Sequence, residues 1–161
     1  MTENLWQVPS QRIDADRARR AVFAQHRELR GLLGRATATA AAALEGNARS
    51  PDAVASAIGD IRTIFDVHLT FEEKVLVPIL EADLPLGPER AQLLREEHTQ
   101  QRALLQALHH EALLAPTLPI LSVKLAQLVD WLLRDMVHEE QHLLTPDVIR
   151  DDQITIDQNT G

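Results

Sequence analysis

Histidine, glutamate and aspartate recur in this sequence at a spacing that lets two side chains of one helix share a metal ion. His68 and Glu72 are four residues apart, and Asp135 and Glu139 repeat that spacing near the end of the chain. An α-helix turns by about 100° per residue, so residues four apart lie one above the other on the same face. Imidazole and carboxylate groups are ligands for iron, manganese and zinc. The spacing therefore points to metal binding.

The composition narrows the chemistry further. The chain has no cysteine, which excludes disulfides, thiolate metal sites and cysteine nucleophiles and leaves imidazole and carboxylate as the strong ligands. The formal net charge is −8, and the one basic stretch, Arg12 to Arg20, is interleaved with Asp14 and Asp16, so nucleic acid is not an expected partner. The sequence shows neither a membrane span nor a signal peptide. We therefore expect a cytoplasmic protein with no membrane partner.

The organisation of the chain favours an all-α fold. A length of 161 residues fits one domain, no sustained alternating pattern indicates a strand, and alanine and leucine dominate the apolar content. Pro78 is expected to bend the second helix or to end it early. Long helices with short connections predict an antiparallel up-down-up-down four-helix bundle at residues 12–146, with an N-terminal arm at 1–11 and a polar tail at 147–161. The expected helices run from Ser10 or Asp14 to about Glu45, from Ser50-Pro51-Asp52 to about Glu81, from Leu86 to about Leu114, and from the Pro116–Pro119 segment to about Leu144.

The apolar stripe of each helix indicates which polar residues face the bundle core. His68 and Glu72 fall near the centre of the second stripe, whereas Glu73 points away; His26 and His98 lie within the first and third stripes. Each histidine alone fits an ordinary hydrogen-bonded core position. Several buried ionisable groups without a shared cation would each need a separate partner, because uncompensated burial of a charge is costly. One metal centre accounts for all of them together.

The fourth helix offers two registers. His138 and His142 have the spacing of a ligand pair, but the apolar stripe places both on the outer face or the flank. The stripe contains Glu139 and has Asp135 at its edge, and the segment that begins at Asp135 matches the one that begins at His68. We therefore expect Asp135 and Glu139 to be the ligands. His138, and with it His142, is the alternative if a π-bulge near Asp135 turns the following residues inward.

In this order along four helices, the residues resemble the hemerythrin-like, or HHE cation-binding, family. The resemblance covers roughly residues 12–146, and it rests on His26, the segment from His68 to Pro78, Glu97-His98 and the segment from Trp131 to Glu140. It implies a non-haem di-iron centre with an open position for dioxygen, nitric oxide or peroxide, with zinc or manganese as other possible metals. The ligands that it implies are His26, His68, His98 and Asp135 as terminal ligands and Glu72 and Glu139 as bridging carboxylates.

Two departures from the family pattern bear on function. Asp135 stands where the family usually has histidine, and Arg102 follows His98 where oxygen carriers have another histidine. Carboxylate oxygens stabilise the ferric state relative to imidazole, so reaction with oxygen or peroxide, iron handling or sensing is expected rather than reversible oxygen carriage. The shorter aspartate side chain leaves a mononuclear site as an alternative. The alternative function is a metal- or gas-responsive sensor or interaction module without catalysis.

Overall fold

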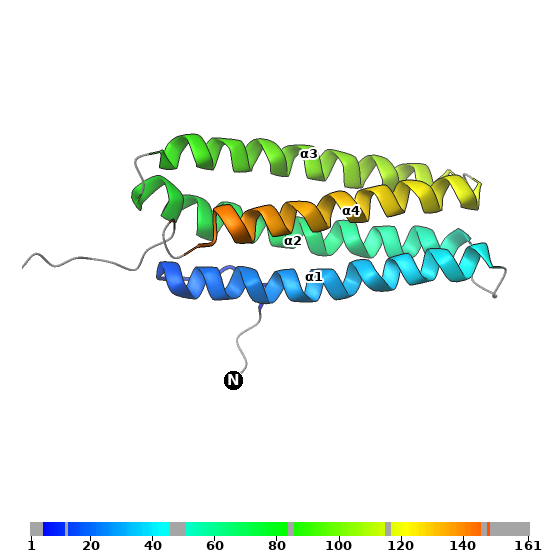
Figure 1. The fold of residues 1–161 in the computed structure, drawn as a ribbon, viewed down its shortest axis with the longest axis horizontal. Helices are drawn as coiled ribbons and strands as arrows, with labels where there is room; N and C mark the ends of the chain where they lie inside the picture. The colour runs from blue at the N-terminus through cyan, green and yellow to red at the C-terminus, as the bar shows by residue number, and fades with distance from the viewer. Residues whose placement is uncertain are drawn as a thin grey trace, which may run out of the picture.

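A computed structural model describes residues 5–11, 13–45, 51–83, 86–114, 117–145 and 148. These residues form four helices and no strand, and the helices run side by side along the long axis of the molecule (Figure 1). The expected all-α bundle is confirmed. The helices are α1 (Ala15–Leu44), α2 (Pro51–Asp83), α3 (Gly87–Leu113) and α4 (Leu118–His142).

The helix ends follow local sequence signals. The Asp14 side chain caps α1 by accepting a hydrogen bond from the backbone N–H of Arg17 at 2.6 Å, so Asp14, not Ser10, begins this helix. α3 and α4 each carry a proline in the first turn, where the missing N–H would have no helical partner. The predicted ends lie within a few residues of the observed ones. Ser50, at which the second helix was expected to begin, lies outside the described residues.

Pro78 was expected to bend α2 or to end it early. It does not end the helix, which continues to Asp83, so the second alternative is wrong and the bend stays a prediction. A proline inside a helix costs about 3 kcal/mol through a lost hydrogen bond and a steric clash. The residues that follow it, Ile79 and Leu80, are 4% and 1% exposed in the apolar interior. Burying two such side chains contributes about 3 to 6 kcal/mol, which offsets the penalty and keeps the helix going.

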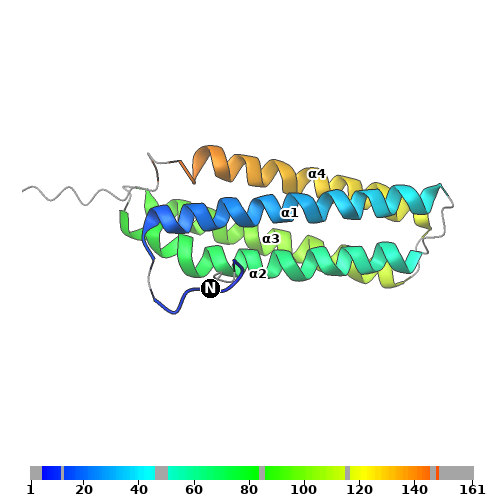
Figure 2. The same ribbon diagram turned by 90° about the horizontal axis from the view of Figure 1, so that it is seen from below.

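The helices alternate in direction, and each neighbour in sequence is a neighbour in space (Figures 1 and 2). α2 packs against both α1 and α3, and α4 packs against α1, whereas α3 and α4 make fewer contacts with each other. The arm contributes Trp6 and Val8 to the edges of the packed interior, and Val148 also packs there. The rest of the predicted tail lies outside the described residues. None of the helices in the described part of the chain is long and apolar enough to cross a membrane.

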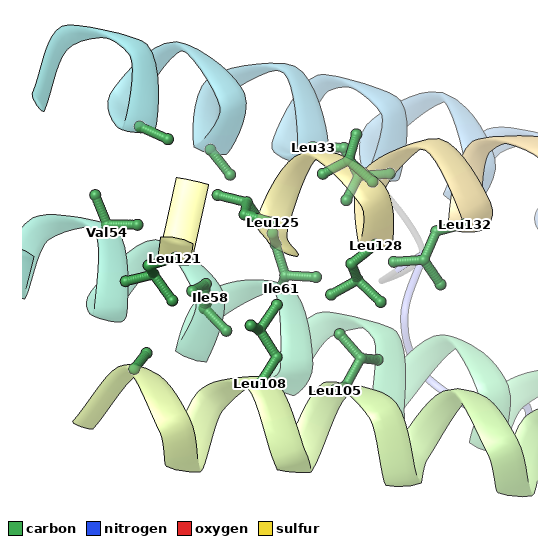
Figure 3. Packing of buried hydrophobic residues seen from close by; sticks show 14 of the residues in the cluster. Leu33, Val54, Ile58, Ile61, Leu105, Leu108, Leu121, Leu125, Leu128 and Leu132 are labelled. Atoms are coloured by element: carbon green, nitrogen blue, oxygen red, sulfur yellow. The ribbon is translucent and has the colours of Figure 1, made fainter. Parts of the chain in front are cut away.

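The apolar interior is divided into two clusters. The distal cluster contains Leu33, Ile58 and Leu125 and fills the half of the bundle shown in Figure 3. The terminal cluster lies at the end where α1 begins and α4 ends, and it contains Val22 and Leu144. On α1, α2 and α3 a segment separates the residues of one cluster from those of the other, and the distal cluster ends on α4 at Met136, before Leu144 of the terminal cluster. Buried polar residues in or next to these segments build the candidate site.

Candidate metal centre

A layer of buried ionisable side chains separates the two apolar clusters. Each helix contributes to it, and the 3.6-residue period that packs apolar residues above and below the layer also aims these side chains inward. The prediction that they face the bundle core is confirmed. The residues of this polar layer, each at most 2% exposed, are His26 of α1, His68 and Glu72 of α2, His98 of α3 and Glu139 of α4.

Four of these residues converge on one point. His26, His68, Glu72 and Glu139 each offer one ligand atom, and these atoms all lie within 4.8 Å of one another. The His26 Nε2 atom is 3.2 Å from Glu139 Oε2, and the His68 Nε2 atom is 3.6 Å from Glu72 Oε1. Ligand atoms bound about 2 Å from one cation lie roughly 3 to 4 Å apart. The spacing therefore fits a shared cation.

Glu72 connects this group to the remaining histidine. Its Oε1 atom faces His26 at 3.8 Å and His68 at 3.6 Å, whereas its Oε2 atom is 3.2 Å from the Nε2 atom of His98. The two oxygens of one carboxylate thus face imidazoles from three different helices. This is the placement that a carboxylate needs to contact two ions at once.

The polar layer leaves buried atoms without hydrogen bonds. A buried polar atom without a partner is destabilising, so native structures rarely keep several in one place. A bound cation would satisfy these atoms together, and the donor set of imidazole nitrogen and carboxylate oxygen suits iron, manganese or zinc. The residues therefore fit a metal. The atoms of the polar layer without a hydrogen-bond partner are His26 Nε2, Glu72 Oε1 and Oε2, His98 Nε2 and Glu139 Oε2; elsewhere in the described part of the chain, Gln101 Oε1 and Ser122 Oγ also lack one.

The two buried glutamates differ in their readiness to ionise. Burial would raise the pKa of Glu72, but the nearby imidazoles of His68, His98 and His26 outweigh burial and lower it. Burial, together with the negative charge of Glu72, raises the pKa of Glu139 to about 8. Near neutral pH, therefore, the layer without a metal holds one ionised and one protonated carboxyl group. A cation would displace that proton.

The three histidines also differ. Burial lowers the pKa of His68 to about 4, despite the attraction of Glu72. Burial would lower the pKa of His26 and His98 as well, but the nearby carboxyl groups of Glu139 and Glu72, respectively, raise it instead. A metal must therefore compete with protons at His26 and His98 and hardly at all at His68.

Asp135 lies at the border of the layer rather than inside it. It is partly exposed and does not belong to the group of converging ligand atoms. Its Oδ2 atom accepts a hydrogen bond from Gln101 Nε2, and burial together with the charge of Glu97 raises its pKa to about 6. His138 and His142 are exposed, as expected from the stripe, and their rings are 4.7 Å apart on the outside of α4.

The sequence reasoning missed the outer partners of the histidines. Glu73, which was predicted to point away from the core, reaches the Nδ1 atom of His98 at 3.1 Å, and Glu140 reaches that of His26 at 2.9 Å. Buried Gln25 contacts the Nδ1 atom of His68 at 2.8 Å. One signal was available for the two glutamates, because each directly follows a buried glutamate in the sequence. Nothing comparable indicates Gln25.

Arg102 stands where oxygen carriers have a histidine, but its guanidinium does not enter the polar layer. Its Nη1 atom is 2.5 Å from Glu73 Oε1, and its Nε atom donates to Asp66 at 2.8 Å. Both partners belong to α2. The departure from the family pattern therefore supplies a partner for Glu73 instead of a metal ligand.

The comparisons with known proteins agree with this geometry. The family model described as the hemerythrin HHE cation binding domain matches residues 17–145. The match spans the polar layer and most of all four helices. No curated protein and no solved structure matches the chain.

Proposed function

The chain belongs to the hemerythrin HHE cation-binding domain family, and we propose that it holds a non-haem di-iron centre in the polar layer. The observation that carries this proposal is the convergence of buried carboxylate and imidazole atoms that have no other partner. Apolar clusters on both sides keep bulk water from the layer, so bound cations are the natural partners for these atoms.

Each residue has a distinct part in the proposed centre. Glu72 and Glu139 would bridge the two ions, since each is buried and Glu72 presents its two oxygens to different imidazoles. His26, His68 and His98 would be terminal ligands. Asp135 would complete the set from the border of the layer, where its Oδ2 atom accepts a hydrogen bond from Gln101.

Bound iron would supply a position at which dioxygen, peroxide or nitric oxide binds or reacts. The protein contributes a dry, carboxylate-rich surrounding that favours ferric iron and therefore a low reduction potential. Burial beside Glu72 raises the pKa of Glu139 to about 8, so Glu139 would hold a proton in the metal-free layer and would have to release it to act as a ligand. These properties suit a reaction with oxygen or peroxide better than reversible oxygen carriage.

Anaerobic titration of the full chain with ferrous iron tests the proposal. We expect about two ions per chain by metal analysis, because the proposed ligands provide three protein donors for each ion. Manganese and zinc titrated in parallel establish which metal binds most tightly, and optical spectra before and after peroxide or azide test for an open position. One ion per chain would contradict the dinuclear centre, and none would contradict the site itself.

A second candidate function is a metal- or gas-responsive interaction module. Its support is a path of hydrogen bonds that links the polar layer to the N-terminal arm: Gln25 contacts His68 and also donates from Nε2 to the carbonyl of Leu5 at 2.8 Å. Metal binding at His68 could therefore tighten the arm. Hydrogen exchange of residues 5–11 should slow on metal loading if this candidate holds, and equal exchange in both forms would eliminate it.

A further inference from the structure

Two of the three buried histidines each contact a glutamate that is in turn held by an arginine. The Nδ1 atom of His26 is 2.9 Å from Glu140 Oε1, and Arg30 holds both oxygens of that carboxylate at 2.9 Å. The three residues come from α1 and α4, and Arg30 lies four residues after His26 on the same helix. They form a continuous path from the polar layer to the partly exposed guanidinium.

The same arrangement recurs on α2 and α3. The Nδ1 atom of His98 is 3.1 Å from Glu73 Oε1, and Arg102, again four residues after the histidine, contacts that oxygen at 2.5 Å and Glu73 Oε2 at 3.2 Å. Both glutamates directly follow a glutamate of the polar layer. The two paths therefore have equivalent positions in the helices that carry them.

His68 has a different support. Its Nδ1 atom is 2.8 Å from the Oε1 atom of Gln25, a neutral amide that is 0% exposed. The Nε2 atom of Gln25 donates to the carbonyl of Leu5, which fixes the orientation of the amide. The acceptor for His68 therefore carries no charge, and its position depends on the N-terminal arm.

An outer acceptor changes what an imidazole can do. A bond from Nδ1–H to an acceptor fixes the tautomer in which Nε2 carries the free lone pair, and a charged acceptor makes that nitrogen a stronger donor than a neutral one does. A guanidinium holds both oxygens of a carboxylate in a fixed plane, which an ammonium group cannot do. The charged supports should therefore strengthen His26 and His98 more than the amide strengthens His68.

We propose that Glu140 and Glu73, each held by an arginine, are positioning residues that make His26 and His98 the strong metal donors, whereas Gln25 and the arm leave His68 the weaker one. This inference rests on the proposed metal centre for the identity of the bound group. It assigns a purpose to Arg102, which supports a ligand from outside the layer.

Measurements of zinc affinity test whether Glu73 and Glu140 differ in effect from ordinary surface ion pairs. Glu73→Gln and Glu140→Gln should each weaken zinc binding to the full chain by about 10- to 100-fold. Arg95→Gln is the matched control, because Arg95 also joins α3 to a glutamate of α2, Glu81, at 2.5 Å, but both side chains of this pair are more than 40% exposed. The control should bind zinc like the parent. Equal affinity in Glu73→Gln and the control would overturn the inference.

A spectroscopic readout distinguishes support from simple folding. In the zinc-loaded parent, proton NMR should show two Nδ1–H signals shifted further downfield than the third, because a charged acceptor makes a stronger hydrogen bond than a neutral amide does. Glu73→Gln should move the signal of His98 alone, and Glu140→Gln that of His26 alone. Three equivalent signals would contradict the proposed inequality. Failure of the parent to take up any metal would instead contradict the proposed function, so the two failures are distinguishable.

Discussion

The distal cluster and the polar layer are neighbouring parts of one interior, but their buried side chains differ in the partners that they have. In the distal cluster, Leu33, Ile58 and Leu125 are each 0% exposed and are surrounded by other apolar side chains (Figure 3). In the polar layer, Glu72 is equally buried, but both its oxygens lack hydrogen-bond partners in the described part of the chain. Packing satisfies the first part, whereas a bound cation would satisfy the second. Stability and metal binding should therefore respond to different substitutions.

The largest effect on metal binding is expected for Glu72→Ala. This change removes the carboxylate that faces all three buried imidazoles, so affinity should fall by more than the roughly 10- to 100-fold typical of losing an outer hydrogen bond. Metal analysis after loading with ferrous iron measures the loss. Near-normal metal content in this variant would remove Glu72 from the proposed centre.

Leu33→Ala is expected to lower stability without affecting metal binding. Truncating a fully buried leucine should lower the free energy of unfolding by about 2 to 5 kcal/mol, while the folded variant keeps its metal stoichiometry. Leu44→Ala is the control on the same helix, because Leu44 is 50% exposed and its truncation should have little effect. Urea unfolding measures both. If Leu33→Ala lost metal at temperatures where it remains folded, metal binding in the polar layer would depend on the packing of the distal cluster.

The pH dependence of the free energy of unfolding should show how the buried carboxyl group of Glu139 destabilises the metal-free protein. Between pH 4.5 and about 8 the unfolded chain has released the Glu139 proton, whereas the folded, metal-free protein keeps it. Raising the pH through this window therefore favours unfolding, and Glu139→Gln should remove that contribution. The stability of the variant relative to the parent should increase across the window, by on the order of a few kcal/mol at its upper end. Parallel stability curves for the two proteins would refute this assignment.

The smallest effects concern the border of the layer on α4. Asp135→Ala should reduce bound metal, His138→Ala should leave it unchanged because His138 is exposed, and Asp135→His should keep the metal and raise its reduction potential. Metal analysis and potentiometry measure these outcomes. Loss of metal in His138→Ala with retention in Asp135→Ala would instead move the ligand to His138.

The sequence predicted the helices and the inward residues because both depend on a local period. Buried polar positions such as His26 and Glu139 are set by the face of one helix, and that face can be read from its own apolar stripe. The outer partners depend on contacts between helices: Arg30 and Glu140 are 110 residues apart in the chain. Periodicity places a residue on a face, but it does not specify which side chain on another helix that residue will reach. Pro78 was misjudged for a similar reason, since packing by the residues after it outweighs the local preference.

Because the arm contacts Gln25, the intrinsic fluorescence of the protein can report whether the arm is docked. The chain has no tyrosine and two tryptophans, so its ultraviolet emission comes from Trp6 and Trp131 alone. Trp6 is next to Leu5, whose carbonyl holds Gln25 and through it His68, and it packs against the distal cluster. Replacing Trp131 with phenylalanine would leave one fluorophore at the outer end of that path. Its emission would then follow the docking of the arm while iron enters or leaves, with no label attached to the chain.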